Sequence, residues 1–204
     1  MCMTRSFIIT KNAVLSLPKT DSHEEIIKAN RLNDSVLAPD FVRVELLPTT
    51  DLEKLDTWEF RLDQDRLPDW WNSKESEIAC REEFAKWVKS HGWKNIPGDL
   101  NLQNCKGLTK LPDQLCSVGG CLSLQGTAVK DLGSLQSVGG SLSLQDTAVN
   151  DLGSLQSVGG SLSLQCTEVK DLGSLQSVGG YLYLHGTAVK KLPKNLKVKE
   201  VIWQ

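Results

Sequence analysis

The sequence predicts an α+β head domain over residues 1–97 followed by a short β-solenoid over residues 98–204. The main observation is a 20-residue period, because the segment Asp131–Val149 returns with few changes from Asp151 and again from Asp171. A unit this short cannot bury its own apolar face, so its copies must stack on one another. The second observation is that residues 1–97 show no such repeat. We expect about six coils, which at about 4.8 Å per strand give a sheet roughly 25 Å across.

The strands predicted in the head come from alternating apolar and polar residues. Ser6–Leu17 alternates in this way and is rich in β-branched residues, which predicts a hairpin turned at Lys11 and Asn12. Phe41–Leu47 predicts a further strand, which Pro48 ends because proline cannot continue the hydrogen-bonded ladder.

Two helices are predicted in the head. Ser22 and Glu25 have the spacing of a capping box, and they precede an apolar stripe that runs to Asn33. Ser73–His91 has the apolar periodicity of a longer helix, with Ser73 or Ser76 as its N-cap. The head is therefore expected to combine antiparallel strands with two helices.

The segment Thr50–Trp71 is dense in acidic residues and tryptophan. Its carboxylates suggest a divalent-metal site, but they lack the spacing of a calcium-binding loop, so a solvated or arginine-paired surface is the favoured interpretation. His23, together with Ser22 or Cys80, suggests a nucleophile and base pair, but helix capping already explains these residues. Most tryptophans are expected in the core, Trp58, Trp87 and Trp93 above all. We expect no catalytic residue, metal or cofactor.

Within the repeat, Leu142 and Leu144 lie two residues apart and Thr147 follows three residues later. This spacing predicts a short strand with its leucines turned inward and its alternate residues, such as Ser143, on a concave outer face. The threonine hydroxyls are expected to form a ladder that satisfies backbone groups where the chain turns inward. The Gly-Gly pairs are expected to provide a positive φ or a close approach at the bend. The return segment, Asp-Leu-Gly-Ser-Leu-Gln, is expected to form turns or short 3₁₀ pieces.

Residues 99–204 resemble the leucine-rich repeat, L-x-L-x-x-N/C/T-x-L, with threonine where asparagine is commonest. Leu-Pro-Asp-Gln-Leu followed by Val-Gly-Gly-Cys-Leu-Ser-Leu-Gln-Gly-Thr-Ala-Val is similar to short leucine-rich-repeat proteins of phages and prophages. The head segments Lys19–His23, Trp58–Asp65 and Leu67–Trp71 are similar to the heads of prophage-encoded proteins. The resemblance implies a phage or prophage accessory factor that occupies a host protein, and it implies no catalytic residues.

Composition excludes several functional classes. Residues 1–98 hold 14 Lys and Arg against 17 Asp and Glu, and residues 99–204 hold 9 against 8, so nucleic acid is not an expected partner. No apolar stretch approaches the roughly 20 residues that cross a bilayer. The first residues lack a secretory signal, which predicts a cytoplasmic protein with no membrane partner. The six cysteines have no zinc-finger or CxxC spacing, and we expect them all to be reduced thiols.

The candidate binding residues lie at the C-terminal end of the concave face. The middle coils offer serine and glutamine there, whereas the fifth coil offers large aromatic side chains and a truncated last coil follows. The predicted partner-binding residues are Tyr181, Tyr183, His185, Trp203, Gln165 and Gln145. The aromatic residues are interpreted either as a lid on the stack or as an interface for a protein partner or a homodimer.

The function predicted is therefore that of a non-enzymatic protein-binding module that acts through the concave face of the solenoid. The alternative is that the head is the active part, as an enzyme of unrecognised type or a nucleic-acid-directed domain, with the solenoid as a targeting arm. A deep polar pocket in the head would favour the alternative. Tryptophans packed against the first coil would favour a head that caps the stack.

Overall fold

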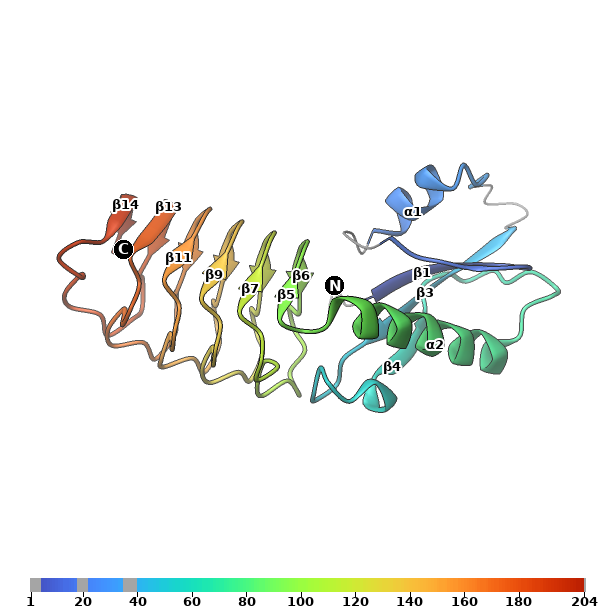
Figure 1. Cartoon of the computed structure of the whole chain (residues 1–204), viewed down its shortest axis with the longest axis horizontal. Coiled ribbons are helices and arrows are strands. Elements are labelled where there is room, and N and C mark those ends of the chain that lie inside the picture. Colours follow the sequence, from blue (N-terminus) through green and yellow to red (C-terminus); the bar gives the residue numbers. More distant parts are fainter. Residues whose placement is uncertain (1–4, 18–21, 35–39, 204) are drawn as a thin grey trace.

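The computed structural model describes residues 5–17, 22–34 and 40–203 of the chain. It shows an elongated molecule with an α+β head at one end and a β-solenoid at the other (Figure 1). The solenoid makes about five turns with a period of about 20 residues between residues 95 and 202. The expectation of about six coils counted both incomplete end coils, and the first ladder strand begins at Asn95, before the expected boundary at residue 98.

The head contains one antiparallel sheet, in the order β2-β1-β3-β4. Its strands are β1 (Arg5–Thr10), β2 (Val14–Leu15), β3 (Phe41–Leu47) and β4 (Glu59–Leu62). The predicted hairpin is confirmed, with Ile9 opposite Val14, and the strand Phe41–Leu47 is confirmed too. Strand β4 was not predicted. It is a largely exposed edge strand within the acidic segment, and pairing with β3 creates it where local strand propensity is weak.

Two α-helices pack on opposite faces of this sheet (Figure 1). Helix α1 (His23–Ala29) begins after Ser22, whose hydroxyl accepts the amide hydrogen of Glu25, and it ends earlier than the predicted Asn33. Helix α2 (Ser73–His91) has the predicted bounds, but Asn72 is its N-cap in place of Ser73 or Ser76. A single 3₁₀ turn, η1 (Leu55–Thr57), precedes β4. Within the described ranges, no helix combines the length and apolarity that crossing a bilayer requires.

The solenoid turns form two ladders of short parallel strands, and in the three middle turns a Gly-Gly pair separates the two strands. The strands of the Ser-Val ladder are β5 (Asn95–Ile96), β7 (Ser117–Val118), β9 (Ser137–Val138), β11 (Ser157–Val158) and the start of β13 (Ser177–Tyr183). Those of the Leu-Ser ladder are β6 (Leu100–Asn101), β8 (Leu122–Ser123), β10 (Leu142–Ser143), β12 (Leu162–Ser163) and the end of β13. Strand β14 (Lys197–Ile202) pairs with β13 and closes the stack.

The Leu-Ser ladder confirms the strand predicted around Leu142. The Ser-Val ladder was not predicted, because the sequence Ser-Val-Gly-Gly was assigned to the connection between coils. Both ladders are in register from turn to turn, so that Leu142 lies beside Leu122 and Leu162. The return segment forms turns, as predicted.

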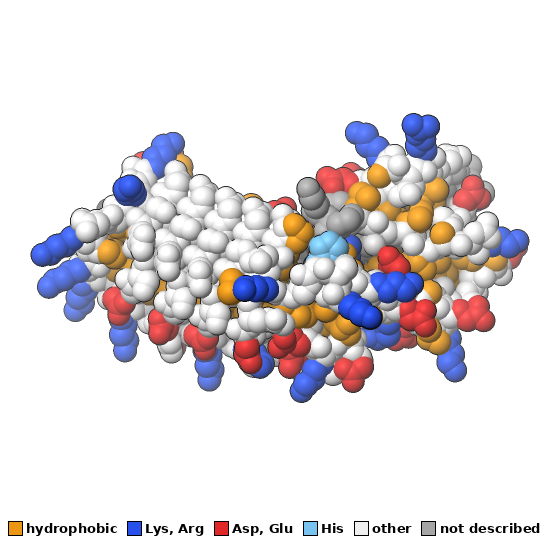
Figure 2. Space-filling view, in the orientation of Figure 1, with side chains coloured by type: hydrophobic (Ala, Val, Ile, Leu, Met, Phe, Trp, Pro, Cys, Tyr) orange, Lys and Arg blue, Asp and Glu red, His pale blue; other side chains and the backbone are white. Residues whose placement is uncertain are grey.

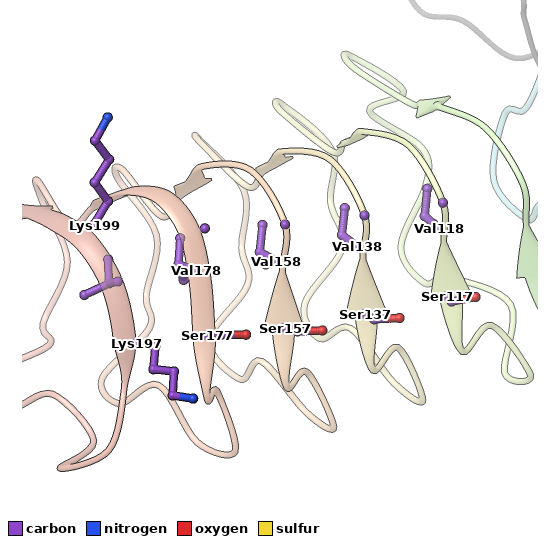
Figure 3. A pocket seen from close by; sticks show the side chains of 15 residues that line it. Ser117, Val118, Ser137, Val138, Ser157, Val158, Ser177, Val178, Lys197 and Lys199 are labelled. Carbon is purple, nitrogen blue, oxygen red and sulfur yellow. The ribbon is translucent and has the colours of Figure 1, made fainter.

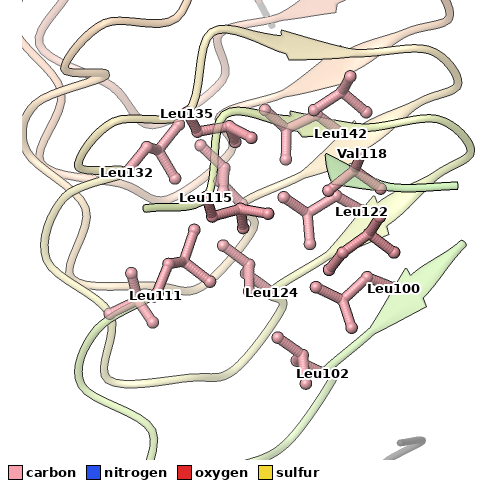
Figure 4. Close-up of a cluster of buried hydrophobic side chains, with 14 of the residues drawn as sticks. Leu100, Leu102, Leu111, Leu115, Val118, Leu122, Leu124, Leu132, Leu135 and Leu142 are labelled. Carbon is pink, nitrogen blue, oxygen red and sulfur yellow. The ribbon is translucent and has the colours of Figure 1, made fainter. Parts of the chain in front are cut away.

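Stacked aliphatic side chains fill the solenoid interior (Figure 4). Each turn adds side chains such as Val138, Leu142 and Leu144 that are at most 1% exposed. Burial of such a side chain contributes about 1.5–3 kcal/mol of transfer free energy. The same apolar cluster continues into the head, where Trp58 and Trp93 are buried, with ring centroids 6.4 Å apart. The prediction of a buried core position is confirmed for these two, whereas Trp87 is only partly buried.

The Gly-Gly pairs allow close approach between turns. Residues 119, 139, 159 and 179 have ordinary φ values, so the positive φ considered for them is not found. A Cβ atom on Gly159 would overlap the carbonyl oxygen of Gly139 in the turn below. Glycine is required here because backbone packs directly on backbone.

The threonine ladder is confirmed. The hydroxyls of Thr127, Thr147 and Thr167 each donate a hydrogen bond of 2.7 Å to the carbonyl oxygen three residues earlier, and these threonines are 5–6% exposed. Thr187 makes the same bond to Leu184 at 2.8 Å. Each hydroxyl thus satisfies a backbone acceptor where the chain leaves the Leu-Ser ladder.

We expect Thr147→Val to destabilise the protein by about 1–3 kcal/mol, because it keeps the side-chain volume but leaves the Leu144 carbonyl without its donor. Urea unfolding measures this change through the midpoint at constant slope. Thr147→Ser is the control, since it keeps the hydroxyl and should retain more stability than the valine variant. Equal urea midpoints for wild type and Thr147→Val would show that this hydrogen bond does not stabilise the protein.

The expectation that every cysteine is reduced is wrong for Cys105, which is disulfide-bonded in the structure. Cys80, Cys116, Cys121 and Cys166 are free thiols, as expected. Cys2 lies outside the described residues. Cys105 occupies the position of the ladder threonines in the first coil, and its amide donates to the Leu102 carbonyl at 3.1 Å. Spacing rules recognise local cysteine motifs, and the lack of such a motif does not exclude a disulfide.

Candidate functional site

The predicted tyrosines lie side by side on the outer surface of the Leu-Ser ladder. Tyr181 and Tyr183 are half-buried, with ring centroids 6.1 Å apart and ring planes tilted by 43°. The Lys199 ammonium lies 4.9 Å from the Tyr181 ring centroid, within cation–π range. The strand holds both rings on one face because alternate residues of a strand point the same way.

The other predicted residues of this face are polar and self-paired. Gln145 donates to the Asp146 carboxylate at 3.2 Å, and Gln165 accepts from the Ser163 hydroxyl at 3.3 Å. His185 is exposed. The row therefore has a polar middle and an aromatic end, as its sequence indicates.

Trp203 does not share the row that was predicted for it. Strand β14 pairs Val198 with Val178 and Glu200 with Tyr181. Two glycines separate the paired residues in β13, but only one residue separates them in β14. This shift places Ile202 beside Tyr183 and moves Trp203 one position further along. A shift of one residue exchanges the two faces of a strand. Trp203 is 47% exposed at the end of the stack, where no further turn covers it.

A groove that the sequence did not predict runs along the Ser-Val ladder (Figure 3). Its volume is about 680 Å³. Serine and valine side chains form parallel rows along it, and the glycines that follow each valine complete its wall. Lys197 and Lys199 line its C-terminal end. The sequence shows the Ser-Val-Gly repeat in every middle coil. Only the pairing of these segments in the Ser-Val ladder makes them one continuous surface.

Charge is distributed unevenly on this part of the molecule. Figure 2 shows a broad uncharged surface over the solenoid, with Lys and Arg side chains gathered at the end away from the head. Five of the nine Lys and Arg residues beyond residue 98 lie in one short segment, and all five are exposed: Lys190, Lys191, Lys194, Lys197 and Lys199. The groove therefore leads from an uncharged floor to a positive end.

The candidate nucleophile and base of the head are not brought together. Cys80 is fully buried in the apolar core beneath α2, and burial raises the pKa of its thiol to about 12. His23 lies on the α1 side of the sheet, where its ring contacts the Val44 carbonyl and the Asp63 carboxylate. Cys80 is therefore inaccessible and protonated at neutral pH, which excludes it as a nucleophile.

The structure brings together a different set of titratable groups in the head. This set contains His23 at the start of α1, Glu45 on β3 and Asp63 directly after β4. One donor atom from each of the three side chains lies within 4.8 Å of the others. Asp63 belongs to the acidic segment that the sequence singled out. Glu45 was missed, because it stands in an otherwise apolar strand and no local spacing links it to the other two.

The head has a smaller hollow than the solenoid. It has a volume of about 330 Å³ and is lined by the β1–β2 hairpin and the start of α2. Trp58 and Trp93, by contrast, pack into the cluster that continues into the first coil. Comparison with protein-family models, curated proteins and solved structures finds no match to this chain.

Proposed function

We propose that the protein is a non-enzymatic binding module whose solenoid holds an extended, acidic segment of a partner protein. The observation that carries this proposal is the groove along the Ser-Val ladder, which runs from an uncharged floor to Lys197 and Lys199. Tyr181 and Tyr183, on the neighbouring ladder, provide an aromatic anchor near the positive end.

The dimensions of the groove suit an extended peptide. Five turns line it, from Ser117 to Lys197, and a spacing of about 4.8 Å per turn gives a length of roughly 20 Å. An extended chain rises about 3.3 Å per residue, so the groove accommodates roughly six residues. Glycines along the wall allow close approach to backbone, and the serine hydroxyls offer hydrogen bonds to it.

The two tyrosines supply the apolar contact area that the serine rows lack. Association must offset lost translational and rotational freedom, and small hydroxyl side chains bury little apolar area. Tyrosine combines a large rigid ring with a polar group, which makes it a frequent anchor of protein interfaces. The lysines favour an acidic partner through electrostatic attraction, which affects the association rate above all.

The spacing of the leucines supports assignment of the turns to the leucine-rich-repeat class, which is part of this proposal. The resemblance to phage and prophage proteins supports a host protein as the partner and a cytoplasmic site of action. The head would act as a cap on the first coil, and its packed tryptophans support that role over a role as the active part. A second copy of the chain is the competing occupant of the aromatic end.

The test is a comparison of Tyr181→Ala/Tyr183→Ala with wild type in proximity labelling followed by mass spectrometry. We expect the double variant to stay folded, because both side chains are only half-buried, and to lose the partner that wild type labels. Loss of such an anchor costs about 2 kcal/mol or more, roughly thirtyfold in affinity. Titration of the purified partner against wild type and the double variant then measures the two affinities directly.

Ser143→Ala is the matched control, because Ser143 lies on the same face without an aromatic ring. It should bind as wild type does. Ser157→Phe should fill the groove and weaken binding, since Ser157 lines it. If the tyrosine variant binds normally while Ser143→Ala does not, the site lies on the polar middle of the sheet. A concentration-dependent dimer that only the tyrosine variant abolishes would assign the surface to self-association.

A further inference from the structure

A histidine and two carboxylates meet between α1 and the head sheet, away from the solenoid surface. His23 is the first residue of α1, Glu45 lies on β3, and Asp63 directly follows β4. The Nδ1 atom of His23 lies 3.1 Å from Oδ2 of Asp63. The three donor atoms, one from each side chain, lie within 4.8 Å of one another.

Glu45 is the unusual member of this group. The residue is 5% exposed, and no described residue donates a hydrogen bond to its carboxylate. The charged groups that act on Glu45 include the Asp63 carboxylate and two basic side chains, His23 and Arg61. A buried carboxylate depends on nearby cations and hydrogen-bond donors for its stability, and a metal ion is the strongest of such cations.

The orientation of the His23 ring is suited to holding a metal ion. Its Nε2 atom lies 3.0 Å from the Val44 carbonyl oxygen, which can only accept, so Nε2 carries the proton. The lone pair of a neutral ring is then on Nδ1, which faces the carboxylates. A hydrogen bond from the second ring nitrogen to a carbonyl is the arrangement that orients metal-ligating histidines in proteins.

We propose that His23 Nδ1, Glu45 and Asp63 form a binding site for Zn²⁺. Two carboxylates and a neutral imidazole balance the charge of a divalent cation. Zinc accepts both nitrogen and oxygen ligands, and three protein ligands with a water in the fourth position are a common set. Calcium and magnesium prefer oxygen ligands in larger number, so a site containing an imidazole favours zinc.

The distances are compatible with a single ion. Zinc–ligand bonds of about 2.1 Å in a tetrahedron place neighbouring ligand atoms roughly 3.4 Å apart. The separation of 3.1 Å between His23 and Asp63 is close to this value. Glu45 would approach the others by a change in its side-chain torsions. The bound ion would join the start of α1 to β3 and β4, so that zinc should stabilise the head.

The experiment is calorimetric titration of ZnCl₂ into the chelator-treated full-length protein. We expect saturable binding of one ion per chain, and a rise in the thermal midpoint when zinc is present. Asp63→Asn and Glu45→Gln should each weaken binding at least tenfold and remove the thermal effect. Asp63 is 40% exposed, so its substitution should leave the fold intact and keep the test valid if the Glu45 variant folds poorly.

Asp65→Asn is the matched control, because Asp65 is an exposed carboxylate of the same segment outside the cluster. It should bind zinc as wild type does. Exposed thiols are a competing site, so the titration is repeated with Cys121→Ser and Cys166→Asp, which restore the residues of the sister repeats. Absence of one-to-one binding, or equal affinity in wild type, Asp63→Asn and Glu45→Gln, would overturn the proposal.

Discussion

A Gly159→Ala variant is expected to lose about 3 kcal/mol or more of its unfolding free energy. The added methyl group would overlap the carbonyl oxygen of Gly139, which belongs to the backbone and cannot rotate away. The turns would have to separate locally, and this would stretch ladder bonds such as Gly159 N–H to the Val138 carbonyl, 2.8 Å long. Overpacking in a close-packed interior costs about 1–3 kcal/mol, and strained backbone hydrogen bonds add to it.

Urea unfolding followed by circular dichroism measures this loss. Ser157→Ala is the matched control, because Ser157 lies two residues earlier in the same turn and its side chain is partly exposed. Surface changes of this kind cost within about 0.5 kcal/mol. Gly139→Ala should behave like Gly159→Ala, because its Cβ would overlap the Gly119 carbonyl oxygen. If Gly159→Ala and Ser157→Ala unfold at the same urea concentration, close approach of the backbones does not explain the glycine pairs.

A fragment of residues 95–204, without the head, is expected to aggregate or to be insoluble. In the whole chain β5 and β6 are the terminal strands of the solenoid sheet, and the head packs on this end. A Cβ atom on Gly107, in the first coil, would overlap the carbonyl oxygen of Thr49, which shows how closely the head approaches. Removal of the head leaves unpaired strand edges and the apolar end of the core in water.

The full-length chain, purified in parallel, is the control for this experiment. Size-exclusion chromatography and thermal unfolding compare the two proteins. A soluble, monomeric fragment that unfolds cooperatively would contradict the role of the head as a cap. The head would then be a separate unit, and the alternative in which it carries the activity would gain support.

Most of the regular elements could be predicted from the sequence, and the failures have a common physical origin. Helix α2 and the strand Phe41–Leu47 have strong local periodicity, so they were predicted with their observed bounds. Strand β4 and the strands of the Ser-Val ladder lack such periodicity, because an exposed edge strand and a two-residue strand show little alternation of apolar and polar residues. Pairing with a neighbour, which comes from elsewhere in the chain, makes each of them a strand.

The candidate sites differ in the same way. Tyr181 and Tyr183 were predicted to share a face, since alternation along one strand is a local property, and the structure places them together. Trp203 was predicted in the same row, but a one-residue difference in the last coil moves it out of that row. His23, Glu45 and Asp63 are separated by about 20 residues each, so no motif could have joined them.

By itself, the sequence determined the repeat, the inward rows of leucine and valine, the threonine ladder and the aromatic end of the solenoid. These features depend on residue type and spacing within a single 20-residue turn, and identical turns can stack in only one register. Only the tertiary structure decided the groove, the place of Trp203, the disulfide-bonded state of Cys105 and the cluster around Glu45. Each of these depends on contacts between separate segments of the chain, and the packing of the folded molecule sets those contacts.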